Sequence, residues 1–191
     1  MSGDLIEAIV YEGADPAEDP RWRLSGARTQ EEYGQWCRHA CGIACLQMVL
    51  HHRDGYARPL LDLLHACTAY GGYVEDGSGH VKGLIYAPFA AYVEAEHALQ
   101  AEVHPHLTLD DIAARLAEGW LVMASVHREI RCPDEPAPGT GGHLVLVTGH
   151  ADGTVHLCNP SGHTPDSRRA QLPEHVFAGF FAERGIALRP K

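Results

Sequence analysis

The chain has 191 residues, of which 45% are hydrophobic, and it carries a formal net charge of −10. This length suits one domain that can bury a sizeable core, and the hydrophobic fraction is ordinary for a globular protein. The negative charge argues against nucleic acid or an anionic membrane as a partner, because phosphate binding needs a basic surface.

The sequence carries neither the pattern of a membrane span nor that of a secretory signal. Its apolar runs fall short of the roughly 18 to 20 residues that a span requires, and its first residues lack a basic stretch followed by an apolar core. We therefore expect a cytoplasmic protein. Its six cysteines should be free thiols, because that compartment is reducing and a chain of this size needs no disulfide scaffold.

The N-terminal part of the chain differs from the rest in composition. Residues 12–20 are acidic and interrupted by prolines, and a basic, tryptophan-containing stretch follows at 21–24. We interpret residues 1–30 as an N-terminal extension that lies over the domain. Residues 31–191 are expected to form a single domain.

The first clear element is a helix from Cys41 to about His52. Its apolar positions recur at helical spacing, which predicts one buried stripe. Basic residues in the last turn suit the negative end of the helix dipole, and Gly55 then ends the helix. The stripe consists of Ile43, Leu46, Val49 and Leu50.

Three more helices are expected before the pattern changes. The first runs from Pro59 to about Tyr70, with the proline in its first turn. The second covers about 83–97, and Pro88 delays its start. The third is capped by Thr108 and ends at Glu118, with acidic residues in its first turn.

After Gly119 the apolar residues form short, β-branched runs that predict buried strands at 120–126 and 143–149. A turn at 151–153 should return the chain as a partner strand at 154–158. Helices therefore precede strands. This order predicts an α+β fold, with N-terminal helices packed on a C-terminal antiparallel sheet.

The start of the first helix is a favourable place for a reactive thiol. The helix dipole and the free N–H groups at Cys41 favour thiolate, and such settings lower a cysteine pKa from about 8.5 to roughly 3.5–7.5. Gln35, expected in a tight loop just upstream, can offer its amide N–H beside the Cys41 backbone N–H to a developing oxyanion. Cys41 is thus the candidate nucleophile.

The predicted hairpin supplies the partner of this thiol. Folding the chain at 151–153 places His143 within one to three residues of facing Asn159. Cross-strand neighbours lie about 5 Å apart and diagonal ones about 7–8 Å. The asparagine oxygen can then accept the imidazole N–H and orient the ring as a general base. Gly139, Gly141 and Gly142 would let a substrate backbone approach the histidine closely.

Two other interpretations remain open at this point. In the first, Asn159, which precedes a proline, does no more than form a turn. The second is a metal site, because a spacing of four residues separates Cys37, Cys41 and Cys45. Structural zinc sites more often use two pairs of closely spaced ligands, and the sequence shows no second cluster. We expect neither a metal nor another cofactor.

The motifs resemble those of papain-like cysteine peptidases that cleave bacteriocin and lanthipeptide precursors after a double-glycine leader, and more narrowly their stand-alone relatives. The similarity covers about residues 30–190, including a closing segment at 180–190 that looks like the last strand of that family. It departs from the family where Asn159 replaces the aspartate usual in the transporter-fused members. The segments that carry the resemblance are Gln35, Cys41-Gly42-Ile43-Ala44-Cys45, Gly142-His143-Leu144-Val145 and Asn159-Pro160.

The resemblance implies a papain-like fold, with Cys41 as nucleophile, His143 as general acid/base, Asn159 as its orienting partner and Gln35 as an oxyanion donor. We expect hydrolysis of a peptide or amide bond through a Cys41 thioester, in natural-product or peptide maturation. Acyl transfer or transpeptidation from the same thioester is an alternative. So is an inactive module that only binds a leader peptide or a carrier protein.

Overall fold

The computed structural model describes residues 18–56, 58–77 and 81–189, so the first seventeen residues of the predicted extension lie outside it. The helices are η2 (Trp22–Ser25), α1 (Gln30–Trp36), η3 (Cys37–His39), α2 (Cys41–Asp54), α3 (Leu60–Ala69), α4 (Tyr86–His97), α5 (Leu109–Ala117), η4 (Arg128–Arg131), α6 (Pro165–Arg168) and α7 (Glu174–Phe180). The strands are β1 (Gln100–His104), β2 (Leu121–Val126), β3 (His143–Ala151), β4 (Thr154–Cys158), β5 (Arg169–Pro173) and β6 (Phe181–Arg189).

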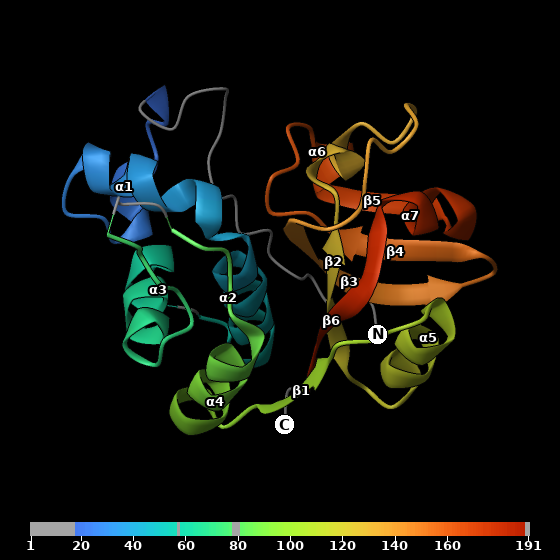
Figure 1. Cartoon of the computed structure of the whole chain (residues 1–191), viewed down its shortest axis with the longest axis horizontal. Coiled ribbons are helices and arrows are strands. Elements are labelled where there is room, and N and C mark those ends of the chain that lie inside the picture. The colour runs from blue at the N-terminus through green and yellow to red at the C-terminus, as the bar shows by residue number, and fades with distance from the viewer. Residues whose placement is uncertain (1–17, 57, 78–80, 190–191) are drawn as a thin grey trace.

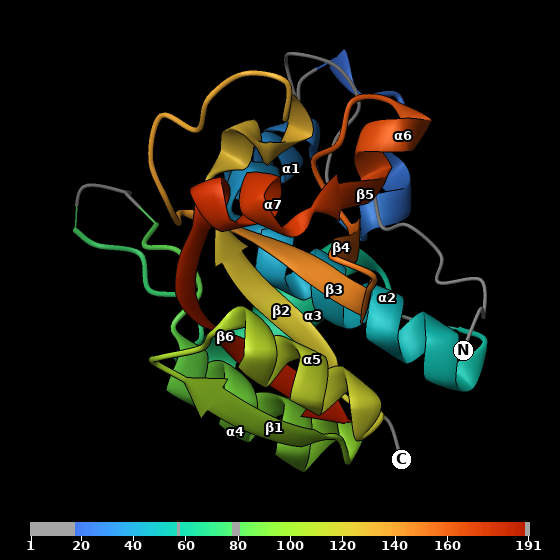
Figure 2. The same ribbon diagram turned by 90° about the vertical axis from the view of Figure 1, so that its right-hand side faces the viewer.

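The strands form a six-stranded sheet in the order β1-β6-β2-β3-β4-β5, and every neighbouring pair is antiparallel. Figure 1 shows α1 to α4 gathered in one half of the molecule and most of the sheet in the other. In Figure 2, turned by 90°, α5 and α7 lie in front of the sheet and α2 and α3 lie behind it. This arrangement confirms the predicted α+β fold with N-terminal helices on an antiparallel sheet.

The sheet is buried on both faces, and the side chains of β3 alternate between two cores. Leu144 and Leu146 belong to the core shared with the N-terminal helices. Val145 and Val147 belong to the core that Ile112 of α5 and Phe177 of α7 complete on the opposite face. Because successive side chains of a strand point to opposite faces, a strand covered on both sides is a continuous apolar run. The runs in the sequence therefore reflect two covered faces.

Helix α2 is the central element of the helical half. The predicted stripe is buried, but so are Gly42, Ala44, Cys45 and Met48, and Gln47 alone between residues 42 and 50 keeps partial exposure. A helix that is apolar all round is one that packs on every side. Here the sheet covers one side of α2, and α3 with the segments around it covers the other.

The β3–β4 hairpin forms as predicted. Asp152 and Gly153, at its tip, have φ angles of 50° and 71°, the left-handed pair that a tight hairpin turn requires. Ala151 pairs with Thr154 and Leu146 with Cys158, and the register shifts between Val147 and Gly149. The hairpin therefore brings residues 143 and 159 to the same end of the sheet.

The sequence did not reveal β1, β5 or α7. β1 and β5 are the two edge strands of the sheet. One face of β5 is exposed and no residue of β1 is fully buried, so polar residues interrupt their apolar pattern. The closing strand expected at 180–190 corresponds to β6 (Phe181–Arg189), which lies inside the sheet between β1 and β2.

The described residues before α1 pack on the helical half. Trp22 of η2 contacts its core, and Asp19 is buried and accepts a hydrogen bond from the Tyr33 hydroxyl of α1. In the part of the chain that the structure describes, no helix has the length and apolar character needed to cross a bilayer.

Gly185 tests the close packing of β6 on β2. A Cβ at this position would lie 2.3 Å from the Met123 carbonyl oxygen, a backbone atom of the central strand β2 that cannot move aside. We expect Gly185→Ala to lower the free energy of unfolding by about 1–3 kcal/mol, measured by chemical denaturation. Gly34→Ala is the control, because nothing lies within 4 Å of a Cβ there. In the helix α1 it should leave stability unchanged or raise it by up to about 1 kcal/mol. Equal changes in the free energy of unfolding for the two variants would contradict the close packing of β6 on β2.

Candidate active site

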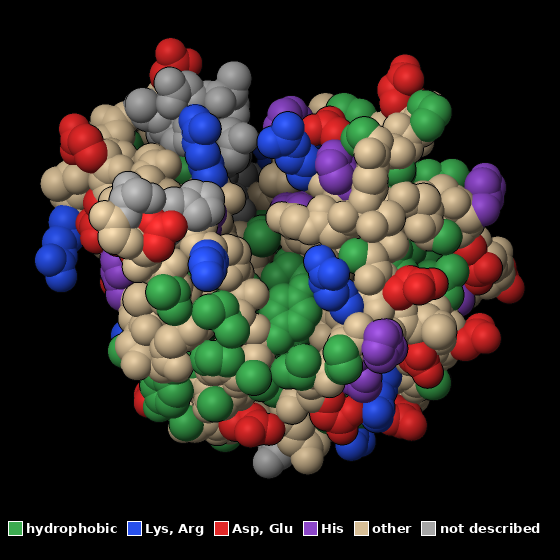
Figure 3. Space-filling model, in the orientation of Figure 1, with side chains coloured by type: hydrophobic (Ala, Val, Ile, Leu, Met, Phe, Trp, Pro, Cys, Tyr) green, Lys and Arg blue, Asp and Glu red, His purple; other side chains and the backbone are tan. Residues whose placement is uncertain are grey.

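A cavity of about 550 Å³ lies where the helical half meets the sheet. Its walls come from Cys41 at the start of α2, the segment 83–86, the start of β3 at 142–144, Ser125 of β2 and Arg184 of β6. Figure 3 shows a hollow between the two halves of the molecule, with apolar side chains on its floor and Lys or Arg side chains on both rims. Cys41 and His143, predicted to be catalytic, thus line one cavity.

Cys41 is the first residue of α2, and its side chain remains partly accessible. The preceding residue, Ala40, offers no side-chain cap, so the N–H groups of the first helical turn are not taken up by one. Burial raises the pKa of the Cys41 thiol, and hydrogen bonds from the backbone N–H groups of Leu144, Gly42 and Cys41 itself act in the opposite direction. The Leu144 N–H also shows that the sulfur faces the residue next to His143.

His143 is the first residue of β3 and is 7% exposed. It pairs with Val126 at the end of β2. Gly141 and Gly142, which lead into it, have φ angles of 77° and 90°, a backbone conformation that residues other than glycine rarely adopt. These glycines therefore turn the chain into the sheet so that the imidazole faces the cavity.

Asn159 and Ser161 hold the imidazole. Asn159 Oδ1 lies 2.8 Å from His143 Nε2 and accepts the Ser161 backbone N–H at 3.0 Å. The Ser161 hydroxyl lies 3.1 Å from the same ring nitrogen and 3.2 Å from the amide oxygen. Because a backbone N–H only donates, it fixes Oδ1 on this side of the amide, and Oδ1 in turn accepts the proton of Nε2. Nδ1 is left with its lone pair.

Asn159 makes a turn contact and a contact with His143 at the same time. The Ser161 N–H bond to the Asn159 side chain is the Asx turn expected before a proline-containing loop. The same oxygen meets His143. Asn159 Nδ2 is buried and has no hydrogen-bond partner among the described residues, so the amide carries an unpaired donor beside the site.

Ser161 is a site residue that the sequence analysis missed. A signal for it existed, because the Asn-Pro pair predicts a turn in which the second residue after the asparagine contacts the amide. Arg184 carried no such signal, because β6 reaches the cavity only through its place next to β2 in the sheet. Arg38 lies close to Cys41 in the sequence, yet its position before the helix does not show which way it faces.

The expected thiolate is not supported in this structure. Burial lowers the pKa of His143 to about 4, with the nearby Arg131 charge adding to this and the Asn159 hydrogen bond opposing it. Burial also raises, rather than lowers, the pKa of Cys41. The helix N-terminus favours the anion, but desolvation outweighs it here. Both shifts favour the neutral thiol and the neutral imidazole.

Gln35 is not in the loop that the sequence predicted. It lies on α1, which continues through η3 to the start of α2, and its side chain is exposed. It is not among the described residues that line the cavity. Helical backbone separates Gln35 from Cys41 where a tight turn was expected, because Tyr33 and Trp36 bury one face of α1 and so fix its course.

All six cysteines are free, as predicted. Cys45 lies one helical turn after Cys41, and its thiol donates to the Leu144 carbonyl at 3.7 Å; Cys37 is buried in η3, outside α2. Among the described residues, no group of three or more His, Cys, Asp or Glu side chains could hold a metal ion. Cys45 thus contributes to the packing of α2 on β3.

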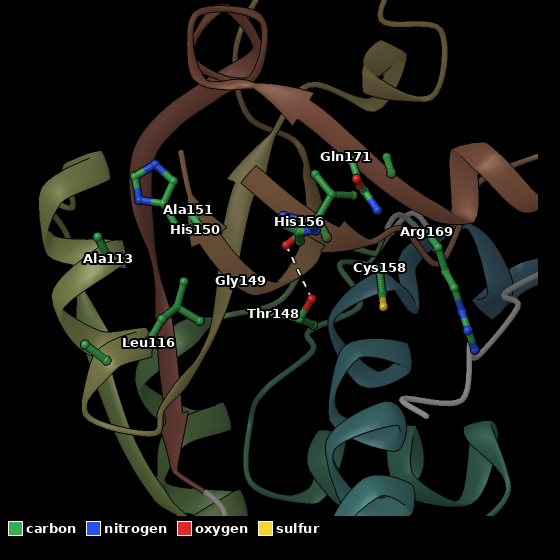
Figure 4. Close-up of a pocket in the computed structure, with 13 residues that line it drawn as sticks. Ala113, Leu116, Thr148, Gly149, His150, Ala151, His156, Cys158, Arg169 and Gln171 are labelled. Atoms are coloured by element: carbon green, nitrogen blue, oxygen red, sulfur yellow. Dashed lines mark hydrogen bonds between the residues drawn. The ribbon is translucent and has the colours of Figure 1, made fainter. Parts of the chain in front are cut away.

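A second cavity, of about 670 Å³, runs along the β3–β4 hairpin between α5 and β5. Figure 4 shows His150 at one side of it and Cys158 at the other, with His156 between them. His150 Nε2 forms a hydrogen bond with Glu174 Oε1 of α7. Cys158 is buried and lies at the opposite side of this cavity from His150, so we take the cavity of Cys41 and His143 as the candidate active site (Figure 4).

No sequence-family profile and no curated protein matches this chain. Solved structures do. A double glycine motif protease from an AMS/PCAT transporter, determined in complex with the leader peptide, aligns at 15% identity over 79% of this chain and 84% of its own, with a TM-score of 0.53. A C39-like peptidase from Bacillus anthracis aligns at 14% identity over 80% of this chain and 90% of its own, with a TM-score of 0.57. The chain has the papain-like cysteine peptidase fold of these domains.

The buried, neutral His143 predicts a specific loss of stability in acid. Unfolding returns the imidazole to water, where it binds a proton below its ordinary pKa of 6.5, whereas in the folded state it does so only below a pKa of about 4. Its contribution is therefore complete above pH 6.5 and is lost as the pH falls to 4. At about 1.4 kcal/mol per pKa unit, the decrease should amount to about 3 kcal/mol.

The measurement is the free energy of unfolding by urea between pH 7 and pH 4, for the wild type and for His143→Gln. The variant should lose less stability than the wild type over this interval, whatever its stability at pH 7. Parallel curves would show that the pKa of His143 is not lowered in the folded protein.

Proposed function

We propose that this chain is a cysteine-dependent hydrolase that cleaves a peptide or amide bond through a thioester on Cys41. The observation that supports it most is the Asn159–His143 hydrogen bond of 2.8 Å in the wall of the cavity that also contains Cys41. With Nε2 held by Asn159, His143 presents the Nδ1 lone pair as its remaining basic group. A thiol, a base and an orienting amide are the parts of nucleophilic acyl transfer.

In the proposed reaction the Cys41 proton passes to His143 Nδ1 as the sulfur attacks the carbonyl carbon. The tetrahedral intermediate collapses when the imidazolium gives this proton to the leaving nitrogen, so an amine departs and a thioester remains on Cys41. Water, deprotonated by His143, then attacks the thioester and releases a carboxylic acid and the free thiol. Proton transfer during attack suits a pair that is neutral before the substrate binds.

The oxyanion of this intermediate requires donors. The Cys41 backbone N–H at the start of α2 is one, and the Gln35 amide is the proposed second. Because Gln35 is exposed on α1, its long side chain has to swing toward Cys41 when the substrate binds. Gln35→Ala should therefore lower kcat by about 100- to 1000-fold while KM changes little. A loss no larger than tenfold would remove Gln35 from the mechanism.

The proposed substrate is a peptide, in particular a precursor peptide of a maturation pathway. One solved structure of this fold was determined with a leader peptide. An amine acceptor in place of water would convert the same thioester into a new amide, and the masses of the products separate this acyl transfer from hydrolysis.

Substitution tests the roles of the catalytic residues on a proteome-derived peptide library analysed by mass spectrometry. Cys41→Ala and His143→Ala should abolish cleavage, with losses of at least about a thousandfold. Asn159→Ala should be milder, because this residue orients the base and does not itself react.

Cys132→Ala is the matched control, since this thiol is exposed and lies outside the cavity. It should retain full activity. Cleavage that persists in Cys41→Ala would reject the thioester mechanism, and an equal loss in Cys45→Ala would instead make the packing of α2 the cause.

A further inference from the structure

Arg38 and Arg184 bring two positive charges to the cavity of Cys41 and His143. Both side chains are exposed and both line this cavity. Among the described residues, no Asp or Glu lines it. No carboxylate in the described part of the chain forms an ion pair with either guanidinium, whereas Arg53, Arg115, Arg128 and Arg131 all have such partners.

The two arginines approach the reacting groups from different halves of the molecule. Arg38 belongs to η3, three residues before Cys41. Arg184 belongs to β6, and its Nη2 lies 2.9 Å from the point that a Cβ on Gly141 would occupy, two residues before His143. The backbone at Gly141 therefore passes directly beneath the guanidinium. Arg38 thus lies close to Cys41 in the chain, and the Arg184 guanidinium lies close to the backbone that leads into His143.

The rest of the chain makes this local charge unusual. The protein has 25 Asp and Glu against 15 Lys and Arg, for a formal net charge of −10. The chain as a whole is acidic, so a generally basic surface does not explain why Arg38 and Arg184 have no carboxylate partner among the described residues. Arg131, which also acts on His143, is bound by Glu129 and so does not add a free charge. Arginine is the side chain best suited to bind carboxylates, through two parallel N–H donors.

We propose that Arg38 and Arg184 bind a carboxylate of the substrate next to the bond that Cys41 attacks. The apolar wall formed by Leu84, Ile85 and Tyr86 then receives the neighbouring apolar part of the same substrate. This inference rests on the proposed hydrolase function and names its substrate class, an acidic peptide. The carboxylate belongs either to an Asp or Glu side chain or to the free C-terminus of the peptide.

Two alkylating reagents test the charge at Cys41 without any turnover. Iodoacetate and iodoacetamide attack the same thiolate, and only iodoacetate carries a carboxylate. The ratio of their rates at one thiol, at one pH, cancels the thiolate fraction. Mass spectrometry gives this ratio at Cys41 and, in the same sample, at the exposed Cys132 as an internal reference.

We expect the iodoacetate to iodoacetamide ratio to be roughly tenfold higher at Cys41 than at Cys132, because a charged cleft concentrates its counter-ion. In Arg38→Gln/Arg184→Gln the ratio at Cys41 should fall to that of Cys132, and 0.5 M salt should have a similar effect on the wild type. Arg189→Gln is the matched control: it removes the same charge from the same strand, where Arg189 lies over Trp120, and should change nothing. Equal ratios at the two thiols would overturn the proposal.

The source of the carboxylate follows from protection of Cys41 against iodoacetamide by three peptides. They are acetyl-Leu-Glu-Gly-amide, acetyl-Leu-Gln-Gly with a free C-terminus, and neutral acetyl-Leu-Gln-Gly-amide. Stronger protection by the first indicates an acidic side chain, and by the second a terminal carboxylate. Equal protection by all three overturns the substrate class.

These outcomes are independent of catalysis. If Cys41→Ala left hydrolysis intact while the alkylation ratio remained high, the hydrolase proposal would fail and the anion site would stand. If hydrolysis depended on Cys41 but the ratio were ordinary, the reverse would hold.

Discussion

The packing of α2 against the first residues of β3 is the constraint on which the candidate site depends. A Cβ on Gly42 would lie 2.5 Å from Leu84 and 3.1 Å from Leu144, so glycine is what lets the helix start come this close. One turn later the Cys45 thiol donates to the Leu144 carbonyl. Cys41 thereby faces the backbone next to His143. Cys41 and His143 line one cavity because two elements about one hundred residues apart share this contact.

That contact has an electrostatic consequence. Burial at this contact removes water from both the thiol and the imidazole, which raises the pKa of Cys41 and lowers that of His143. Neither group then holds a charge before a substrate arrives. Hydrogen bonds among the described residues, and not an ion pair, hold the imidazole in place: Asn159 and Ser161 fix the ring through a network that includes a main-chain N–H. In the proposed mechanism His143 is a base with one free lone pair, and it takes the Cys41 proton during the attack.

The fold and the charge distribution answer different questions. The papain-like fold is shared with peptidase domains at 14–15% identity, and a fold alone does not specify a substrate. Specificity resides in the side chains that line the cavity. In an acidic chain, two arginines without a carboxylate partner among the described residues and an apolar wall around Cys41 support the proposed substrate, which is anionic at one position and apolar beside it.

The sequence by itself determined the helices α2 to α5, the β3–β4 hairpin and the pairing of His143 with Asn159. These features depend on local periodicity and turn residues, and the hairpin spans only sixteen residues between the two side chains. The edge strands β1 and β5 escaped prediction because their exposed positions interrupt the apolar pattern. Only the tertiary structure decided the course of α1, and with it the exposed position of Gln35, as well as the place of Arg184 and the ionisation of Cys41. Each of these depends on which distant segment covers the residue, and burial by a distant segment leaves no trace in local spacing.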